Sequence, residues 1–260
     1  MAFTFDHLDN PDKRTWHVSG YQNNALDLSG NPNCMLLHFP GDEIRTIHGP
    51  ETTHRFMADM TRVLPALEPL RDFRNSRGTR SASNFQPRVE EYGDYHVVLA
   101  QDDTNILDML EAVPEQRRPP RTKQLEALVN WYQQKFENYC FVLACFVGEV
   151  RPIHPIVVEY VPHNDDVLFV PGLEAHDGLP PVIGQPVERD FRVAFGLQVC
   201  PQPVQVQYTD HAIRGQRWAP DDVTGMYDNR LQGPNQDYVV PYDSIKDGLF
   251  GKELLEVLVG

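Results

Sequence analysis

The sequence lacks a long apolar run and lacks an excess of positive charge. No stretch approaches the roughly eighteen consecutive apolar residues that a membrane helix needs. The 260 residues hold 37 acids against 23 lysines and arginines, a formal net charge of -14. Nucleic acids and anionic membranes bind positively charged faces, so the overall charge argues against both as partners. We therefore expect no membrane contact and no nucleic-acid binding.

No secretory leader is expected, and cysteines are few. The first twenty residues carry Asp, His and Pro where a signal peptide has its apolar stretch, which predicts a cytoplasmic protein. No C-x-x-C pair is present. Free cysteines in apolar surroundings behave as small buried hydrophobes, so we expect reduced, buried thiols. Cys140 and Cys145 are five positions apart in an apolar run, which places them on opposite faces of a strand.

The common catalytic motifs are absent as well. The chain has no phosphate-binding G-x-x-x-x-G-K-[ST], no G-x-G-x-x-G, no H-E-x-x-H and no G-x-S-x-G. Their absence lowers the expectation for the commonest enzymes but leaves the question of catalysis open.

The first half of the chain alternates strand-like and helix-like patterns. Short β-type runs at 16–21 and 34–39 are separated by a turn-rich segment, which predicts a hairpin. Apolar residues recur at helical spacing over 52–64. Residues 95–100 predict another strand, after which Thr104 is expected to cap a helix that ends at Pro114.

Residues 122–147 give the clearest signals. Thr122 is a candidate helix cap, and the positions that follow it form one apolar stripe at i, i+3, i+4, i+7 and i+11. These positions are Leu125, Leu128, Val129, Tyr132 and Phe136. The run at 139–147 is apolar throughout, which predicts a central strand covered on both faces.

The sequence pattern of the second half predicts mainly strands. Runs at 156–161 and 167–171 flank a turn-like HNDD and predict a second hairpin, and two more strands are expected at 192–199 and 204–208. A polar crossing is expected after 208, and the last residues, from Asp243 onward, suggest a helix. The fold class predicted is α+β, a mixed or antiparallel sheet with helices packed on it and a β-rich second half.

The favoured organisation is a single domain over 1–260, with an N-terminal lobe at 1–90 and a C-terminal lobe at 91–260 as the alternative. A mobile Arg-rich loop is expected at about 71–92, because that stretch has no apolar period. Bases also surround the Pro119-Pro120 pair. These islands are either ordinary solvated loops or a contact for an anion or an acidic protein. The candidate contact residues are Arg74, Arg77, Arg80, Arg117, Arg118 and Arg121.

A histidine-carboxylate set lies around the second predicted hairpin. With its turn near His163, His154 falls opposite Leu173 and near Glu174 and His176, and Asp177 turns in where the strand ends. Histidine with carboxylates is the ligand set of a divalent metal such as zinc, or of a general-base pair. The same residues also suit a structural turn, in which the Asp accepts backbone N–H groups and Gly178 supplies a positive φ.

Several segments, taken in order, resemble an uncharacterised bacterial protein family. They extend over about residues 90 to 197. They are the strand and helix of EYGDYHVVLAQDDTNILDML, the helix ending WYQQKF, the strand YCFVLACF, the His-Pro segment IHPIVVEYVP, the segment LFVPGLEAHDG and the later RDFRVAFG. The resemblance implies an architecture and a place to look for a site. It implies no activity.

Two functions follow as hypotheses. The first is a non-catalytic interaction or structural component with protein partners and no cofactor. The alternative is a metal-dependent hydrolase or metal-binding protein that uses His154, Glu174 and His176.

Overall fold

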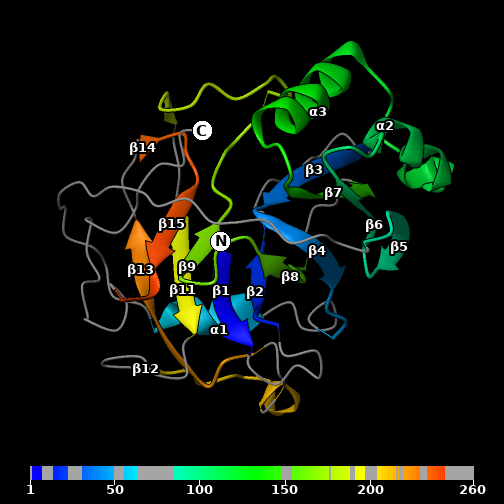
Figure 1. Cartoon of the computed structure of the whole chain (residues 1–260). Coiled ribbons are helices and arrows are strands. Elements are labelled where there is room, and N and C mark those ends of the chain that lie inside the picture. The colour runs from blue at the N-terminus through cyan, green and yellow to red at the C-terminus, as the bar shows by residue number, and fades with distance from the viewer. Residues whose placement is uncertain are drawn as a thin grey trace.

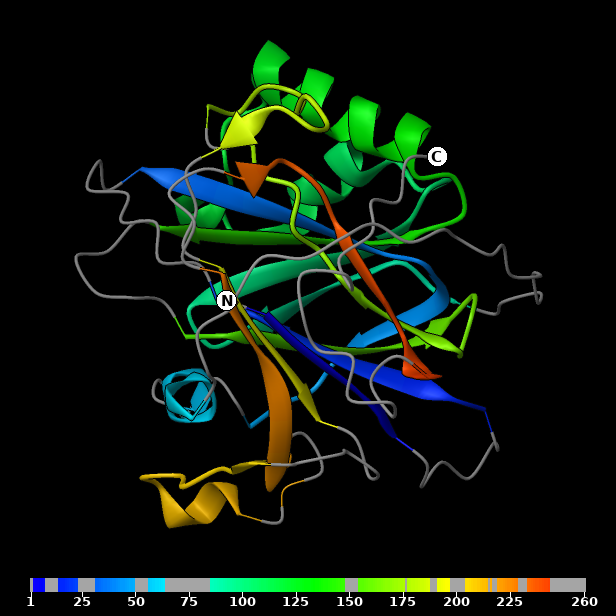
Figure 2. The ribbon, with the colours of Figure 1, turned by 90° about the vertical axis from the view of Figure 1, so that its left-hand side faces the viewer.

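The computed structural model describes most of the chain. The described ranges are 2–7, 14–22, 31–49, 56–63, 85–147, 154–175, 177–187, 191–196, 204–214, 216, 219–228 and 233–243. Within them the protein is rich in β-structure, and helices are a minor part, so strands dominate both halves of the chain rather than only the second. The elements are arranged in layers (Figure 1 and Figure 2).

A four-stranded antiparallel sheet has the order β3-β7-β6-β5. Its strands are β3 (Pro32–Phe39), β5 (Arg88–Tyr92), β6 (Tyr95–Gln101) and β7 (Cys140–Val147). The predicted central strand is confirmed, because β7 lies between β3 and β6 and is buried along almost its whole length.

A larger, mixed sheet has the order β12-β13-β11-β1-β2-β8-β4. Its strands are β1 (Ala2–His7), β2 (Trp16–Tyr21), β4 (Gly41–Thr46), β8 (Ile156–Pro162), β11 (Phe191–Gly196), β12 (Val204–Gln205) and β13 (Asp222–Asp228). β1 pairs in parallel with β11 and antiparallel with β2. The N-terminal strand therefore lies in the interior of this sheet.

Two small pairs of strands complete the β-structure. β9 (Val167–Val170) pairs with β15 (Tyr238–Pro241), and β10 (Pro186–Val187) pairs with β14 (Gly233–Pro234). Residues 235–237, which lie between β14 and β15, are therefore close both to the end of β9 and to the start of β10.

The helices cover outer faces of the two large sheets. α3 (Lys123–Lys135) and α2 (Ile106–Met109), with the 3₁₀ turns Leu110–Ala112 and Glu115–Arg117, lie on the four-stranded sheet. α1 (Phe56–Arg62) and the 3₁₀ turn His211–Ile213 lie on the far side of the larger sheet (Figure 2). The Thr122 cap is confirmed, since its side chain accepts the Leu125 N–H, whereas the cap of α2 is Asn105 rather than Thr104.

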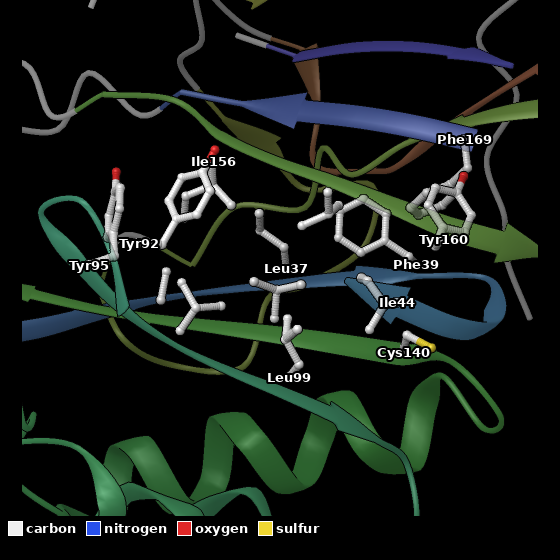
Figure 3. Close-up of a cluster of buried hydrophobic side chains, with 14 of the residues drawn as sticks. Leu37, Phe39, Ile44, Tyr92, Tyr95, Leu99, Cys140, Ile156, Tyr160 and Phe169 are labelled. Carbon is white, nitrogen blue, oxygen red and sulfur yellow. The ribbon is translucent and has the colours of Figure 1, made fainter. Parts of the chain in front are cut away.

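The period-2 pattern of the buried strands creates three apolar cores. On β7, Cys140 and Val142 face the core between the sheets, whereas Phe141, Leu143 and Cys145 face α3. Cys140 and Cys145 therefore do lie on opposite faces. The core between the sheets includes Phe39, Ile44, Tyr160 and Phe169 (Figure 3). Both faces of the four-stranded sheet are thereby buried.

Two predicted hairpins are wrong. The strands at 16–21 and 34–39 exist, but β2 belongs to the seven-stranded sheet and β3 to the four-stranded one. β8 and β9 also exist, but β8 pairs with β2 and β4, and β9 pairs with β15. Strand pairing is decided by which faces must be buried together, and a turn-like sequence between two strands does not fix it.

Other boundaries also change. β5 occupies the end of the predicted 71–92 loop, and β13 occupies part of the expected polar crossing. The strands at 192–199 and 204–208 are separated by β13 in the sheet. The rest of the Arg-rich loop and the C-terminal helix predicted from Asp243 onward lie almost entirely outside the described residues.

Candidate functional site

His154 is a buried structural residue. Its Nε2 accepts the backbone N–H of Asp94 at 2.7 Å, and its Nδ1 donates to the carbonyl of Pro155 at 3.0 Å. The Tyr95 hydroxyl donates to the His154 carbonyl, and the Tyr92 and Tyr95 rings pack against the imidazole. A neutral imidazole with its proton on Nδ1 satisfies both hydrogen bonds. The ring is therefore already engaged on both nitrogens in joining the β5–β6 turn to the start of β8.

Glu174 lies in a different arrangement. Its backbone N–H donates to Asn235 Oδ1 and its carbonyl accepts from Asn235 Nδ2, each at 2.8 Å. Because β8 and β9 do not pair, the cross-strand geometry that put His154 opposite Leu173 is wrong. The turn formed by Asp177 is as expected, since its Oδ1 accepts the Leu179 N–H at 3.0 Å.

A metal centre at these residues has no support from the described side chains. Within the described ranges, no group of three or more histidine, cysteine, aspartate and glutamate residues is placed to hold a metal ion. His176 lies outside these ranges, so its place in the set is still a prediction.

The arginines around the Pro119-Pro120 pair make hydrogen bonds and ion pairs within the chain. Arg118 pairs with Glu111 at 2.7 Å, and Arg121 pairs with Asp108 at 3.1 Å and with Glu126 at 3.0 Å. Arg117 donates to the carbonyl of Asp94. These arginines connect the turns after α2 with the first turn of α3, which is a structural use of their charge. The other candidates, Arg74, Arg77 and Arg80, lie outside the described residues.

A buried hydrogen-bonded pair, His38 and Asp237, escaped the sequence analysis. His38 Nε2 lies 2.7 Å from Asp237 Oδ2, and both side chains are 1% exposed. The imidazole stacks on Phe136 with ring centroids 4.0 Å apart. A polar residue inside the apolar run CMLLHF was the one available signal, since a buried histidine needs a partner.

Asp237 also holds the chain that leaves β9. Its second oxygen, Oδ1, accepts the N–H groups of Gly172 at 2.8 Å and Leu173 at 3.2 Å. Gly172 is required here, because a Cβ at this position would meet the Gln236 carbonyl oxygen at 2.5 Å. One carboxylate therefore joins β3, the start of β15 and residues 172–173.

Asn235 holds the other end of the same segment. Its carbonyl accepts the Gly184 N–H at 2.8 Å, and its N–H donates to the Gln185 carbonyl at 2.8 Å. Asn235, Gln236 and Asp237 are buried. We call residues 173–185 the clamped loop, because both of its ends are fixed by the same short segment that precedes β15.

Two large apolar side chains project from the clamped loop. Leu179 is 46% exposed and Val182 is 62% exposed, while Pro181 between them is buried. Among the described residues the other large exposed apolar side chain is Val204, in β12. The clamped loop runs beside α3 at the top of Figure 1 and Figure 2. Such an arrangement is suited to binding, since it presents apolar surface to solvent.

The comparisons with known proteins give a distant structural likeness. No family model matches the chain, and no curated protein matches it. Baculovirus P35, in a mutated form after caspase cleavage, superposes with a TM-score of 0.43 and 13% identity over 82% of this chain and 69% of that chain. P35 in its caspase-8 complex gives 0.38 and 11% over 94% and 88%. A likeness of this order defines neither fold family nor function, and the bacterial resemblance is still a prediction.

No described helix is long and apolar enough to cross a membrane.

Proposed function

We propose that the protein is a non-catalytic interaction component whose partner is another protein, and that it acts in the cytoplasm. The observation that carries the proposal is the clamped loop, which exposes Leu179 and Val182 while its ends are hydrogen-bonded to Asn235 and Asp237. Exposed apolar side chains in one place on a surface are typical of protein-binding sites. The internal use of His154, Arg118 and Arg121 supports the same interpretation.

The test is the mass of the tagged full chain purified from its source cells under native conditions. We expect a stable complex with a second, different protein, and therefore a mass above the 29.8 kDa of the chain alone. A chain that remains a monomer in fresh extract contradicts the proposal.

The metal-dependent alternative is tested by the melting temperature of the protein with and without added zinc. Binding of a divalent ion by His154, Glu174 and His176 stabilises the folded state by RT ln(1 + [L]/Kd), so the melting temperature rises with added zinc. That rise must disappear in His176→Ala. We expect no rise, because His154 already uses both ring nitrogens within the fold.

A further inference from the structure

We propose that the clamped loop is the contact element itself, and that it inserts Leu179 and Val182 into an apolar pocket rimmed by lysine or arginine on a different protein. This inference deepens the proposed function and rests on it. It adds which residues bind and what chemistry the partner must offer.

The first step is rigidity. The loop begins at N–H groups bound to Asp237 and ends at Gly184 and Gln185, which are bound to the backbone of Asn235. Between these ends, the Gly178 N–H donates to Ala175 at 2.9 Å and the Leu179 N–H donates to Asp177 at 3.0 Å. A loop ordered before binding loses less conformational entropy when it binds.

The sequence of the loop reinforces this order. Pro180 and Pro181 each lock their own φ near about −65°, which removes freedom that a flexible loop would lose on binding. Gly178 has φ of 72°, in the left-handed region, and its Cβ position is open, so the sharp turn before Leu179 is made without strain.

The second step is the direction of the side chains. Pro181 is buried and Ile183 is half-buried, whereas Leu179 and Val182 point into solvent. The loop therefore packs Pro181 against the body of the protein and leaves Leu179 and Val182 open to solvent, where they can enter a pocket. Apolar side chains that enter a pocket contribute to binding in proportion to the apolar area that they remove from water.

The third step is charge. Residues 171–187 contain Glu174 and Asp177 and no lysine or arginine. Asp177 is exposed directly beside the apolar tip. A complementary surface therefore has an apolar centre and a basic rim.

The charge also decides against a second copy of this chain. Each copy has a net charge of -14, so two clamped loops placed face to face bring like charges together. A different, basic-rimmed protein is the occupant that the loop fits.

The experiment places a photo-crosslinker, p-benzoylphenylalanine, in the full chain at position 182, and in a matched variant at position 204. Val204 is the control because it is also an exposed apolar residue, 39% exposed, and β12 lies at the opposite end of the molecule from the clamped loop (Figure 1). We expect position 182, and not position 204, to crosslink to one protein in the source cells.

The crosslinked protein is then purified and titrated with the full chain. We expect Val182→Asp to weaken Kd by about tenfold or more, and Val204→Asp to leave it within roughly twofold. We also expect Kd to weaken as salt is raised, because a basic rim facing Asp177 is screened. Unchanged melting temperatures in both variants show that lost binding is not lost folding.

Four results overturn the inference: a crosslink from position 182 to another copy of this chain, no crosslink from position 182, equal effects of the two substitutions, or binding that salt does not weaken. The proposed function fails separately. If native purification yields a heteromeric complex but no crosslink forms from position 182, the protein binds a partner through another surface. If neither is found, both proposals fail.

Discussion

Residues 94–147 and the clamped loop are stabilised in contrasting ways. In the first region β6, α2, α3 and β7 are close in sequence and bury a continuous apolar surface on one another. In the second, the start of the loop bonds to the side chains of Asn235 and Asp237, 61 to 65 positions away, and its end bonds to the backbone of Asn235. The first region is specified by many interchangeable apolar contacts, and the second by a few polar groups that nothing nearby can replace.

The largest effect is expected at Asp237. Asp237→Ala leaves His38 buried without its partner and removes the acceptor of the Gly172 and Leu173 N–H groups. A buried polar group left without its hydrogen-bond partner costs about 1 to 3 kcal/mol of unfolding free energy, and several groups lose Asp237 at once. Urea denaturation measures it, and Asp237→Asn, which keeps the size and an acceptor oxygen, should lose less. A loss equal to that of an exposed aspartate would show that Asp237 does not fix the loop.

The next effect is in the core beneath α3. Leu143 is 1% exposed between α3 and the sheet, so Leu143→Ala should cost about 2 to 5 kcal/mol through lost burial and a residual cavity. The matched control is Leu128→Ala, because Leu128 is a half-buried member of the same cluster and should cost less. The sequence places Leu128 in the apolar helical stripe and Leu143 in the apolar run 139–147, and it predicts both to be buried, so the difference between the two variants tests the structure.

A third prediction concerns His17, which faces Tyr160 and Tyr242 from the larger sheet. Burial lowers the pKa of His17 from 6.5 to about 4, and the charge of Asp165 opposes this only in part. Since the folded-state pKa is the lower one, the unfolded chain takes up the proton first as pH falls. The contribution of His17 to the unfolding free energy is therefore fully present above about pH 6.5, and it decreases by about 3 kcal/mol as pH falls to about 4.

Denaturation midpoints at several pH values test this prediction, with His17→Leu as the control. The leucine variant should lose the part of the pH dependence that belongs to His17, while acid effects from other groups persist. An unchanged pH profile in His17→Leu would show that His17 does not titrate in this way.

The smallest effect is expected at the tip of the clamped loop. Val182 is largely exposed, so Val182→Ser should change the unfolding free energy by no more than about 0.5 kcal/mol. Thermal melting compares it with the wild type. A large loss would mean that Val182 contributes to the fold, and the contrast between the anchors of the loop and its tip would then be false.

The sequence predicts elements better than it predicts their partners. The stripe around Val129 and Tyr132 and the apolar run of β7 gave a helix and a doubly covered strand, because local periodicity reports directly on burial. Cys145 and Phe141 accordingly lie on the face of β7 that packs against α3.

Pairing could not be read in the same way. Both β8 and β9 were found as strands, yet each pairs with strands distant in sequence, so the predicted hairpin is wrong, while the metal site proposed at its end stays a prediction. Asn235 and Asp237 stand in a short polar stretch with no period, and only the position of β15 beside β9 shows what they hold.

The place of β1 inside the larger sheet has a consequence for how the protein is made. β1 leaves the ribosome well before its parallel partner β11, at residues 191–196. Until β11 has been synthesised, one edge of β1 has no strand to pair with, and exposed strand edges are prone to aggregation. Contacts this far apart in sequence also slow the final folding step, to milliseconds or longer. The nascent chain should therefore depend on chaperones that shield unpaired strands, and slower translation of the first half should not help it to fold.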